Sequence, residues 1–504
     1  MPIKKYVPDD LFLLINSLSK AEKRYFKIFV TRGGETDKSY LQLFDIINEQ
    51  LEYDEKQVKA TLNGKRIVNN LYVAKKYLLE LILKSLINFH AESSIDFKIK
   101  MQLLKIDILN RKNLFDISNK YLKRVEATAV PHDKKIFLPE IYSLMKTNVV
   151  DLMHQKHTSA EIYGIIEKEK QALIELGNKN AYKSLMLEVS QKQINMGGVT
   201  PSQVKATYAE ILKRPLLQNE KTALTLDAKV LFHNINAYLK KDSGLYEESL
   251  GHFKRFITLI ENEPNQKANY IIGLYNYAIL LSETGRYTEL EKVLKKAHAI
   301  PADSAALQLR QFKNHYQLIL TYHNNTGQFN EAIAIENEVL EGIEKYRVKL
   351  DEIYRLRIYF YLAFAYFGEN DFNNAMKYLN KIVNEPKIES SMRLFLLSKI
   401  LMMMIHFEQK NIEISKYVAT SIIRVMKKKK LQDVCEYLFC LFFANMKTLP
   451  TTNDWKQLDS EWRKRSDAAT SPPFVTEYME IEKWIISKAT GKSYADVLKQ
   501  KLKK

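Results

Sequence analysis

A short turn motif recurs along the second half of this chain. It consists of a glycine or asparagine, any residue, an aromatic residue, two further residues and usually a small one, as in SGLYEES, TGRYTEL, TGQFNEA and ENDFNNA. A weaker copy, QKNIEIS, carries isoleucine in the aromatic position. The intervals are 41, 42, 43 and 40 residues between Tyr246, Tyr287, Phe329, Phe372 and Ile412. Self-similarity at a period of roughly 20 to 50 residues indicates an array of stacked repeats.

The composition indicates that these repeats are helical. Glycine accounts for 15 and proline for 12 of the 504 residues, about 3% and 2%, where roughly 7% and 5% are usual. Sheets need turns rich in both residues at short intervals, and this chain has too few of them. The sequence therefore predicts an all-α fold, a solenoid of helical hairpins in which each unit buries its apolar face on its neighbours.

Residues at fixed distances from the turn extend the motif in the clearest copies. Small or apolar residues stand before and after the turn aromatic, at Ala278, Leu281, Leu294 and Ala297 in one copy and at Ala363, Tyr366, Leu379 and Ile382 in another. Over residues 229–430 this pattern resembles the tetratricopeptide repeat (TPR) family. The resemblance implies paired helices that approach closely at small residues, with the turn aromatic filling the gap to the next unit. The period of about 41, against about 34 in that family, predicts helices about one turn longer.

Four segments are predicted along the chain. Residues 1–92 form a small helical N-terminal head, residues 93–228 are divergent helical hairpins, residues 229–430 are the TPR-like repeats, and residues 431–504 are C-terminal capping helices.

Two capping boxes mark helix starts in the predicted head. Ser19-x-x-Glu22 and Asp54-x-x-Gln57 each place a capping side chain three residues before a side chain that can reach back to its N–H group. We therefore expect helices from near Lys20 and Glu55. The blocks SLSKAEKRYFKIF and NNLYVAKKYLLELILKSL in this region also resemble an uncharacterised family of helical-repeat proteins from Bacteroidetes, and this resemblance implies no activity.

The cysteines and apolar runs predict the compartment. Cys435 and Cys440 lie in the apolar stretch CEYLFC and cannot form a disulfide framework. No apolar run approaches the length of a spanning helix. The apolar patch near the N-terminus is too short for a signal peptide and is flanked by Asp9 and Asp10. A cytoplasmic protein without a membrane span is expected.

The formal charge of +18 is compatible with an acidic partner, nucleic acid or an anionic membrane surface. Basic residues are mostly interleaved with acidic ones, however, and the run Lys427–Lys430 fits the end of a helix, where cations complement the helix dipole. The alternative function is a regulator that binds nucleic acid through a helix-turn-helix in the head. Its candidate residues are Lys56, Lys59, Lys65 and Arg66.

Neither a catalytic nor a cofactor-binding residue is predicted. Gly491-Lys492-Ser493 resembles the end of a phosphate-binding loop, but Ile486 stands where the motif needs glycine, and Ser493-x-x-Asp496 predicts a helix start instead. The chain is therefore expected not to be an enzyme.

No metal site is predicted either. His154, His157 and Glu161 could share one helix face, but Thr158-x-x-Glu161 is a capping box that would leave both histidines in a loop.

The resemblance to TPR proteins implies a partner-binding groove lined by the first helix of each unit. Its predicted residues are Asn234, Tyr238, Tyr275, Asn276, Asn314, Gln317, Thr321, Arg357, Phe360, Tyr361 and Phe364. Amides and exposed aromatic rings suit a peptide or an amphipathic helix. The leading hypothesis is therefore a non-enzymatic scaffold that binds a protein or peptide. The sequence leaves open whether the aromatic residues are instead covered by the chain's own following helix or terminal segment.

Overall fold

The computed structural model describes residues 9–32, 38–64, 66–92, 94–151, 159–195, 201–386, 391–468 and 479–503. All regular secondary structure in these ranges is helical, which confirms the predicted all-α class. In the same ranges no helix combines the length and the apolar character that crossing a membrane requires. The chain divides into two compact units, Met1–Gly177 and Asn178–Lys504. The four segments proposed from the sequence stay a prediction.

The first unit begins with short helices, and the starts of two of them were predicted from the sequence. It contains α1 (Asp10–Ser17), α2 (Lys20–Arg32), α3 (Lys38–Glu49), α4 (Glu55–Thr61), α5 (Leu71–His90), α6 (Ile95–Arg111), α7 (Phe115–Ala129) and α8 (Leu138–Asp151), and the boundary between the units falls within α9 (Ser159–Asn195). The capping box at Ser19 is confirmed, because the Ser19 N–H donates to the Glu22 carboxylate at 2.7 Å and Ser19 Oγ accepts from the Glu22 N–H at 3.3 Å.

The second predicted capping box forms with a different partner. The Asp54 carboxylate caps α4 by accepting from the N–H groups of Lys56 and Gln57. The Asp54 N–H, however, donates to the side chain of Gln50 at 3.1 Å, whereas Gln57 Oε1 accepts from Gln50 Nε2. The predicted helix start is correct, and the reciprocal bond comes from Gln50, the residue that follows α3.

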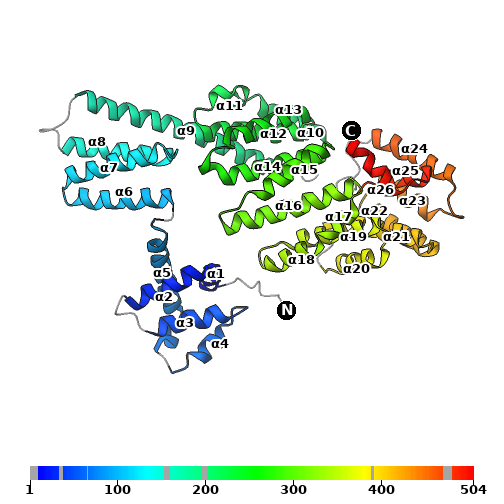
Figure 1. The fold of residues 1–504 in the computed structure, drawn as a ribbon, viewed down its shortest axis with the longest axis horizontal. Coiled ribbons are helices and arrows are strands. Elements are labelled where there is room, and N and C mark those ends of the chain that lie inside the picture. Colours follow the sequence, from blue (N-terminus) through cyan, green and yellow to red (C-terminus); the bar gives the residue numbers. More distant parts are fainter. Residues whose placement is uncertain are drawn as a thin grey trace. The chain divides into compact units, whose positions relative to one another are not determined.

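The second unit contains the recurring turns (Figure 1, green to red). Its helices are α10 (Pro201–Leu212), α11 (Pro215–Gln218), α12 (Leu226–Asp242), α13 (Tyr246–Ile260), α14 (Lys267–Glu283), α15 (Tyr287–Ala299), α16 (Ala305–Asn325), α17 (Phe329–Ala334), α18 (Glu336–Lys345), α19 (Glu352–Gly368), α20 (Phe372–Val383), α21 (Met392–Glu408), α22 (Ile412–Lys428), α23 (Cys435–Ala444), α24 (Thr452–Ala468), α25 (Ile481–Thr490) and α26 (Tyr494–Lys499), followed by the 3-10 helix η7 (Gln500–Lys503).

Each recurring turn has the same backbone geometry. A residue with positive φ ends the first helix of a pair, and the second helix begins two residues later with the turn aromatic or its isoleucine substitute. The N–H after the positive-φ residue bonds to the carbonyl five residues earlier, as from Arg286 to Leu281 at 2.9 Å, which is the Schellman arrangement. The positive-φ residues are Gly244, Gly285, Gly327, Asn370 and Lys410.

A sixth turn of this kind lies in the first unit and was missed in the sequence. Asn113 has φ of 56°, and α7 begins two residues later at Phe115. The Leu114 N–H bonds to the Leu109 carbonyl at 3.0 Å, as in the other turns. The segment NLFDIS fits the motif, so the signal was present in the sequence.

Close helix approach explains the small residues of the motif. The residue three positions after each turn aromatic is fully buried, including Ser249, Ala332, Ala375 and Ser415. Buried serines at these positions bond to the partner helix, as when Ser249 Oγ donates to the Ala237 carbonyl at 2.7 Å. Each helix pair therefore has a sterically constrained interface close to its turn.

Substitution of Gly273 by alanine is expected to destabilise the second unit. A Cβ at this position in α14 would lie 2.0 Å from Phe256 Cε1, a ring atom in the buried core. The ring or the helix must shift, and overpacking of this kind costs about 1–3 kcal/mol. Thermal or urea unfolding of the purified variant measures this loss.

Gly251→Ala is the matched control, because Gly251 lies within α13 and a Cβ there meets nothing within 4 Å. Alanine should stabilise this exposed helical position by about 0.5–1 kcal/mol. Equal effects of the two substitutions would show that Phe256 does not restrict the α13–α14 interface.

Candidate functional site

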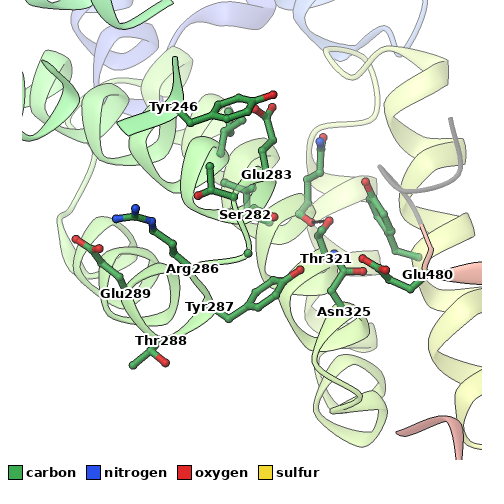
Figure 2. A pocket seen from close by; sticks show the side chains of 16 residues that line it. Tyr246, Ser282, Glu283, Arg286, Tyr287, Thr288, Glu289, Thr321, Asn325 and Glu480 are labelled. Carbon is green, nitrogen blue, oxygen red and sulfur yellow. Dashed lines mark hydrogen bonds between the residues drawn. The ribbon is translucent and has the colours of Figure 1, made fainter. Parts of the chain in front are cut away.

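A pocket of about 1180 Å³ lies in the second unit at the turn between α14 and α15 (Figure 2). The end of α14, the turn and the start of α15 form one part of its lining, and one face of α16 forms another. The lining residues are Tyr246, Ile279, Ser282, Glu283, Thr284, Gly285, Arg286, Tyr287, Thr288, Glu289, Gln317, Leu318, Thr321, Asn325, Tyr361 and Glu480. The pocket thus draws on several helix pairs and on the residue that precedes α25.

Polar side chains on α16 follow helical spacing along the pocket. Gln317, Thr321 and Asn325 are separated by four residues each, so they share one face of the helix. Thr321 Oγ1 donates to the Gln317 carbonyl at 2.8 Å, and Gln317 Oε1 accepts from Arg357 Nη1 at 3.2 Å. These contacts orient neutral hydrogen-bonding groups along the pocket wall.

Tyr287 joins this polar row from the start of α15. Figure 2 shows Tyr287, Thr321, Asn325 and Glu480 near one another. Burial raises the pKa of the Tyr287 phenol, the negative charge of Glu480 acts in the same direction, and a hydrogen bond with Asn325 opposes them. The hydroxyl therefore stays protonated at neutral pH and offers a hydrogen-bonding group to the pocket.

The charged side chains around the turn form ion pairs with oppositely charged side chains. Lys241 Nζ lies 2.8 Å from Glu283 Oε1, Arg286 pairs with Glu247, and Lys254 Nζ lies 3.2 Å from Glu289 Oε1. Burial alone would raise the pKa of Glu289, but the hydrogen bond from Tyr277 and the pairing with Lys254 lower it below its ordinary value. The lining includes no histidine or cysteine. The charged side chains are paired with one another, so the neutral side chains of the pocket are the groups suited to hydrogen bonding with a ligand.

The structure brings three of the predicted groove residues together in this pocket, namely Gln317, Thr321 and Tyr361. The others lie elsewhere on the first helices of their pairs. Asn234, Tyr238, Asn276, Asn314 and Arg357 are half-buried, and Tyr275 is buried.

The aromatic end of the predicted groove is covered by the chain itself. Phe360 and Phe364 have no exposed surface, which agrees with the second of the two alternatives that the sequence left open. The Phe364 ring centroid lies 6.0 Å from that of Phe329 and 6.1 Å from that of Tyr494 in α26. For Phe364, the C-terminal helix α26 therefore supplies apolar surface that a partner could otherwise provide.

Sequence reasoning missed several pocket residues. Asn325 could have been found by extending the four-residue spacing from Gln317 and Thr321. Ser282 and Tyr287 were recognisable only as turn-region residues, and no sequence signal connects Glu480 to α16.

The candidate residues of the nucleic-acid alternative lie near α4, which has seven residues. Lys56 is exposed, and Lys59 Nζ pairs with Glu55 Oε1 at 2.8 Å. Lys65 lies outside the described residues, and Arg66 begins the 3-10 helix η1 (Arg66–Asn70).

Two motifs of the sequence, the histidine pair and the segment around Ser493, were considered for metal and phosphate binding. His154 and His157 lie outside the described residues; within the described ranges, no group of three or more histidine, cysteine, aspartate or glutamate residues could hold a metal ion. Ser493 caps α26 by accepting from the Asp496 N–H at 3.1 Å, which confirms the predicted helix start.

The two cysteines are free and buried. Burial raises the pKa of the Cys435 thiol to about 11, and burial also raises the pKa of Cys440. Neither side chain is therefore a thiolate at neutral pH.

Comparison with known proteins does not place the chain in a family. No family model matches the chain, and no curated protein matches it.

Proposed function

We propose that residues 229–430 form a TPR-like solenoid, that the chain is a non-enzymatic interaction scaffold, and that it binds an extended polypeptide segment in the pocket of Figure 2. The observation that carries the proposal is that this pocket contains Gln317, Thr321 and Tyr361 of the predicted groove. The recurrence of one turn geometry at nearly constant intervals supports the repeat architecture. The buried free thiols fit a reducing, cytoplasmic location.

The spacing of polar groups supports an extended ligand. Gln317, Thr321 and Asn325 follow one another at four-residue steps, about 6 Å each along a helix. Alternate residues of an extended peptide are about 6.6 Å apart. Three successive polar side chains on α16 can therefore meet alternate backbone groups of one peptide, and their neutrality fits recognition of a main chain.

A substitution that fills the pocket tests this proposal. Ser282→Trp places a large ring among the lining residues, and it should weaken binding of a polypeptide partner about tenfold or more, the equivalent of about 1.4 kcal/mol. The partner is first isolated from native cytosol at two salt concentrations with and without nuclease. The affinity of the purified partner is then measured by calorimetry.

Thr258→Trp is the control, since Thr258 is an exposed position on α13 outside the pocket lining. Its affinity should match that of the unmodified chain. The pocket proposal fails if Ser282→Trp also binds normally. The scaffold proposal fails if the material retained is nucleic acid that salt removes, because phosphate contacts are salt-sensitive.

A further inference from the structure

The C-terminal segment, residues 493–503, lies on the repeat array as a separate short element. It comprises α26 and η7 and follows Gly491, an exposed left-handed residue at the end of α25. A helix of six residues has little stability by itself. Its helicity must therefore depend on the surface that it covers.

Tyr494 anchors this segment in an aromatic socket. Its ring centroid lies 6.0 Å from that of Phe329, 6.1 Å from that of Phe364 and 6.4 Å from that of Phe367. The Tyr494 hydroxyl donates to the Glu480 carbonyl at 3.0 Å. The socket thus combines the start of α17 with the end of α19, two consecutive helix pairs.

The segment continues across the array with one apolar face. Val497 and Leu498 are buried, whereas Asp496 and Lys499 are exposed. Leu502 packs against the core cluster that includes α14 and α15, and η7 contacts α15. The segment therefore has the pattern of an amphipathic helix bound across repeat units, a recurring mode of peptide recognition.

The turn at Gly327 is shaped for this contact. A Cβ on Gly327 would lie 2.6 Å from the Ala495 carbonyl oxygen, so only glycine allows the backbone of α26 to approach. The equivalent turn at Gly285 has almost the same φ, 71° against 69°, but a Cβ there would have only Tyr287 Cε2 within 4 Å, at 3.9 Å. The two glycines differ in what covers them.

We propose that the Gly327 turn and the Phe329, Phe364 and Phe367 rings form a docking site for an amphipathic helix, which the C-terminal segment occupies in cis. The ligand is a partner helix with an aromatic residue followed three and four residues later by aliphatic residues, as in Tyr494, Val497 and Leu498. Such a partner must displace the C-terminal segment. Displacement of the segment also affects the pocket of Figure 2, because Glu480 accepts the hydrogen bond from Tyr494 and lines that pocket.

The test compares Gly327→Ala and Gly285→Ala in a full chain that also carries Tyr494→Ala, which removes the ring that holds the C-terminal segment in the socket. Both substitutions place alanine at a positive φ, so they share the backbone strain, and only Gly327→Ala also clashes with Ala495. The probe is a fluorescent synthetic peptide of residues 491–504, with binding measured by anisotropy. Tyr494→Ala alone should bind the peptide about tenfold more tightly than the unmodified chain, because an occupied site lowers the apparent affinity. Gly327→Ala should remove this gain and Gly285→Ala should keep it, because the Cβ on residue 327 meets Ala495 of the peptide as it meets Ala495 of the chain. The same peptide with Tyr494→Ala should bind weakly to all three.

A chain ending at Thr490 gives an independent measurement. It should unfold cooperatively and bind the peptide at least as well as the Tyr494→Ala chain. Equal peptide binding by the two glycine variants would overturn the proposal, as would loss of cooperative unfolding in the truncated chain, which would make the segment part of the core. Ser282→Trp should leave peptide binding unchanged, so failure here is distinguishable from failure of the proposed pocket function.

Discussion

Replacement of Phe364 by alanine is expected to lower the stability of the second unit sharply. Its side chain has no exposed surface and contacts the rings of Phe329 and Tyr494. Removing a fully buried phenylalanine costs about 3–5 kcal/mol, because transfer free energy is lost and a cavity remains. Phe360→Ala should have an effect of the same size, since Phe360 is equally buried. The free energy of unfolding in urea, followed by circular dichroism, measures both losses.

Tyr417→Ala is the control for aromatic content, because Tyr417 lies on α22 with 76% of its surface exposed. Exposed substitutions of this kind usually change stability by less than about 0.5 kcal/mol. A Phe360 and Phe364 double variant that unfolds like the unmodified chain, but fails to capture its partner, would favour an open aromatic groove, the other alternative that the sequence left open.

Acidification from pH 7 to pH 5 is expected to destabilise the second unit. Burial lowers the pKa of His252 to about 4 and that of His315 to about 3, and positive charge on neighbouring histidines acts in the same direction. Burial also lowers the pKa of three further histidines of this unit, His233, His323 and His406. The unfolded chain therefore takes up protons that the folded chain excludes.

The direction of this pH effect on stability follows from the difference in proton binding between the unfolded and folded chains. Stability rises with pH wherever the unfolded state binds more protons. For His252 and His315 the loss begins as pH falls below the ordinary value near 6.5 and continues toward their folded values. At pH 5 each contributes about 1–2 kcal/mol of destabilisation. Carboxylates whose pKa is lowered, such as Glu289, contribute mainly below about pH 4.5.

Urea unfolding at pH 7, 6 and 5 measures this dependence. The double variant His252→Gln with His315→Gln should show a smaller loss of stability between pH 7 and 5, because glutamine does not titrate. An unfolding free energy that is flat over this range in the unmodified chain would contradict the role of these buried histidines.

Local interactions account for what could be predicted from the sequence. The turns at Gly244, Gly285 and Gly327 depend on residues within six positions of one another, since a positive φ and a Schellman hydrogen bond need nothing else. Helix starts at Ser19 and Ser493 depend on side chains three residues apart. Such signals are complete within the local sequence, so the all-α class and the turn positions could be predicted from the sequence.

Only the tertiary structure shows which segments of the chain cover the apolar and polar helix faces. Helical spacing indicates that Phe360 and Phe364 lie on faces with aromatic character, but a buried face and a partner-binding face have the same pattern. Tyr494 covers Phe364 from 130 positions along the chain, and Glu480 completes a pocket on α16 in the same way. Periodicity specifies that a surface needs a partner, whereas only long-range packing determines which segment that partner is.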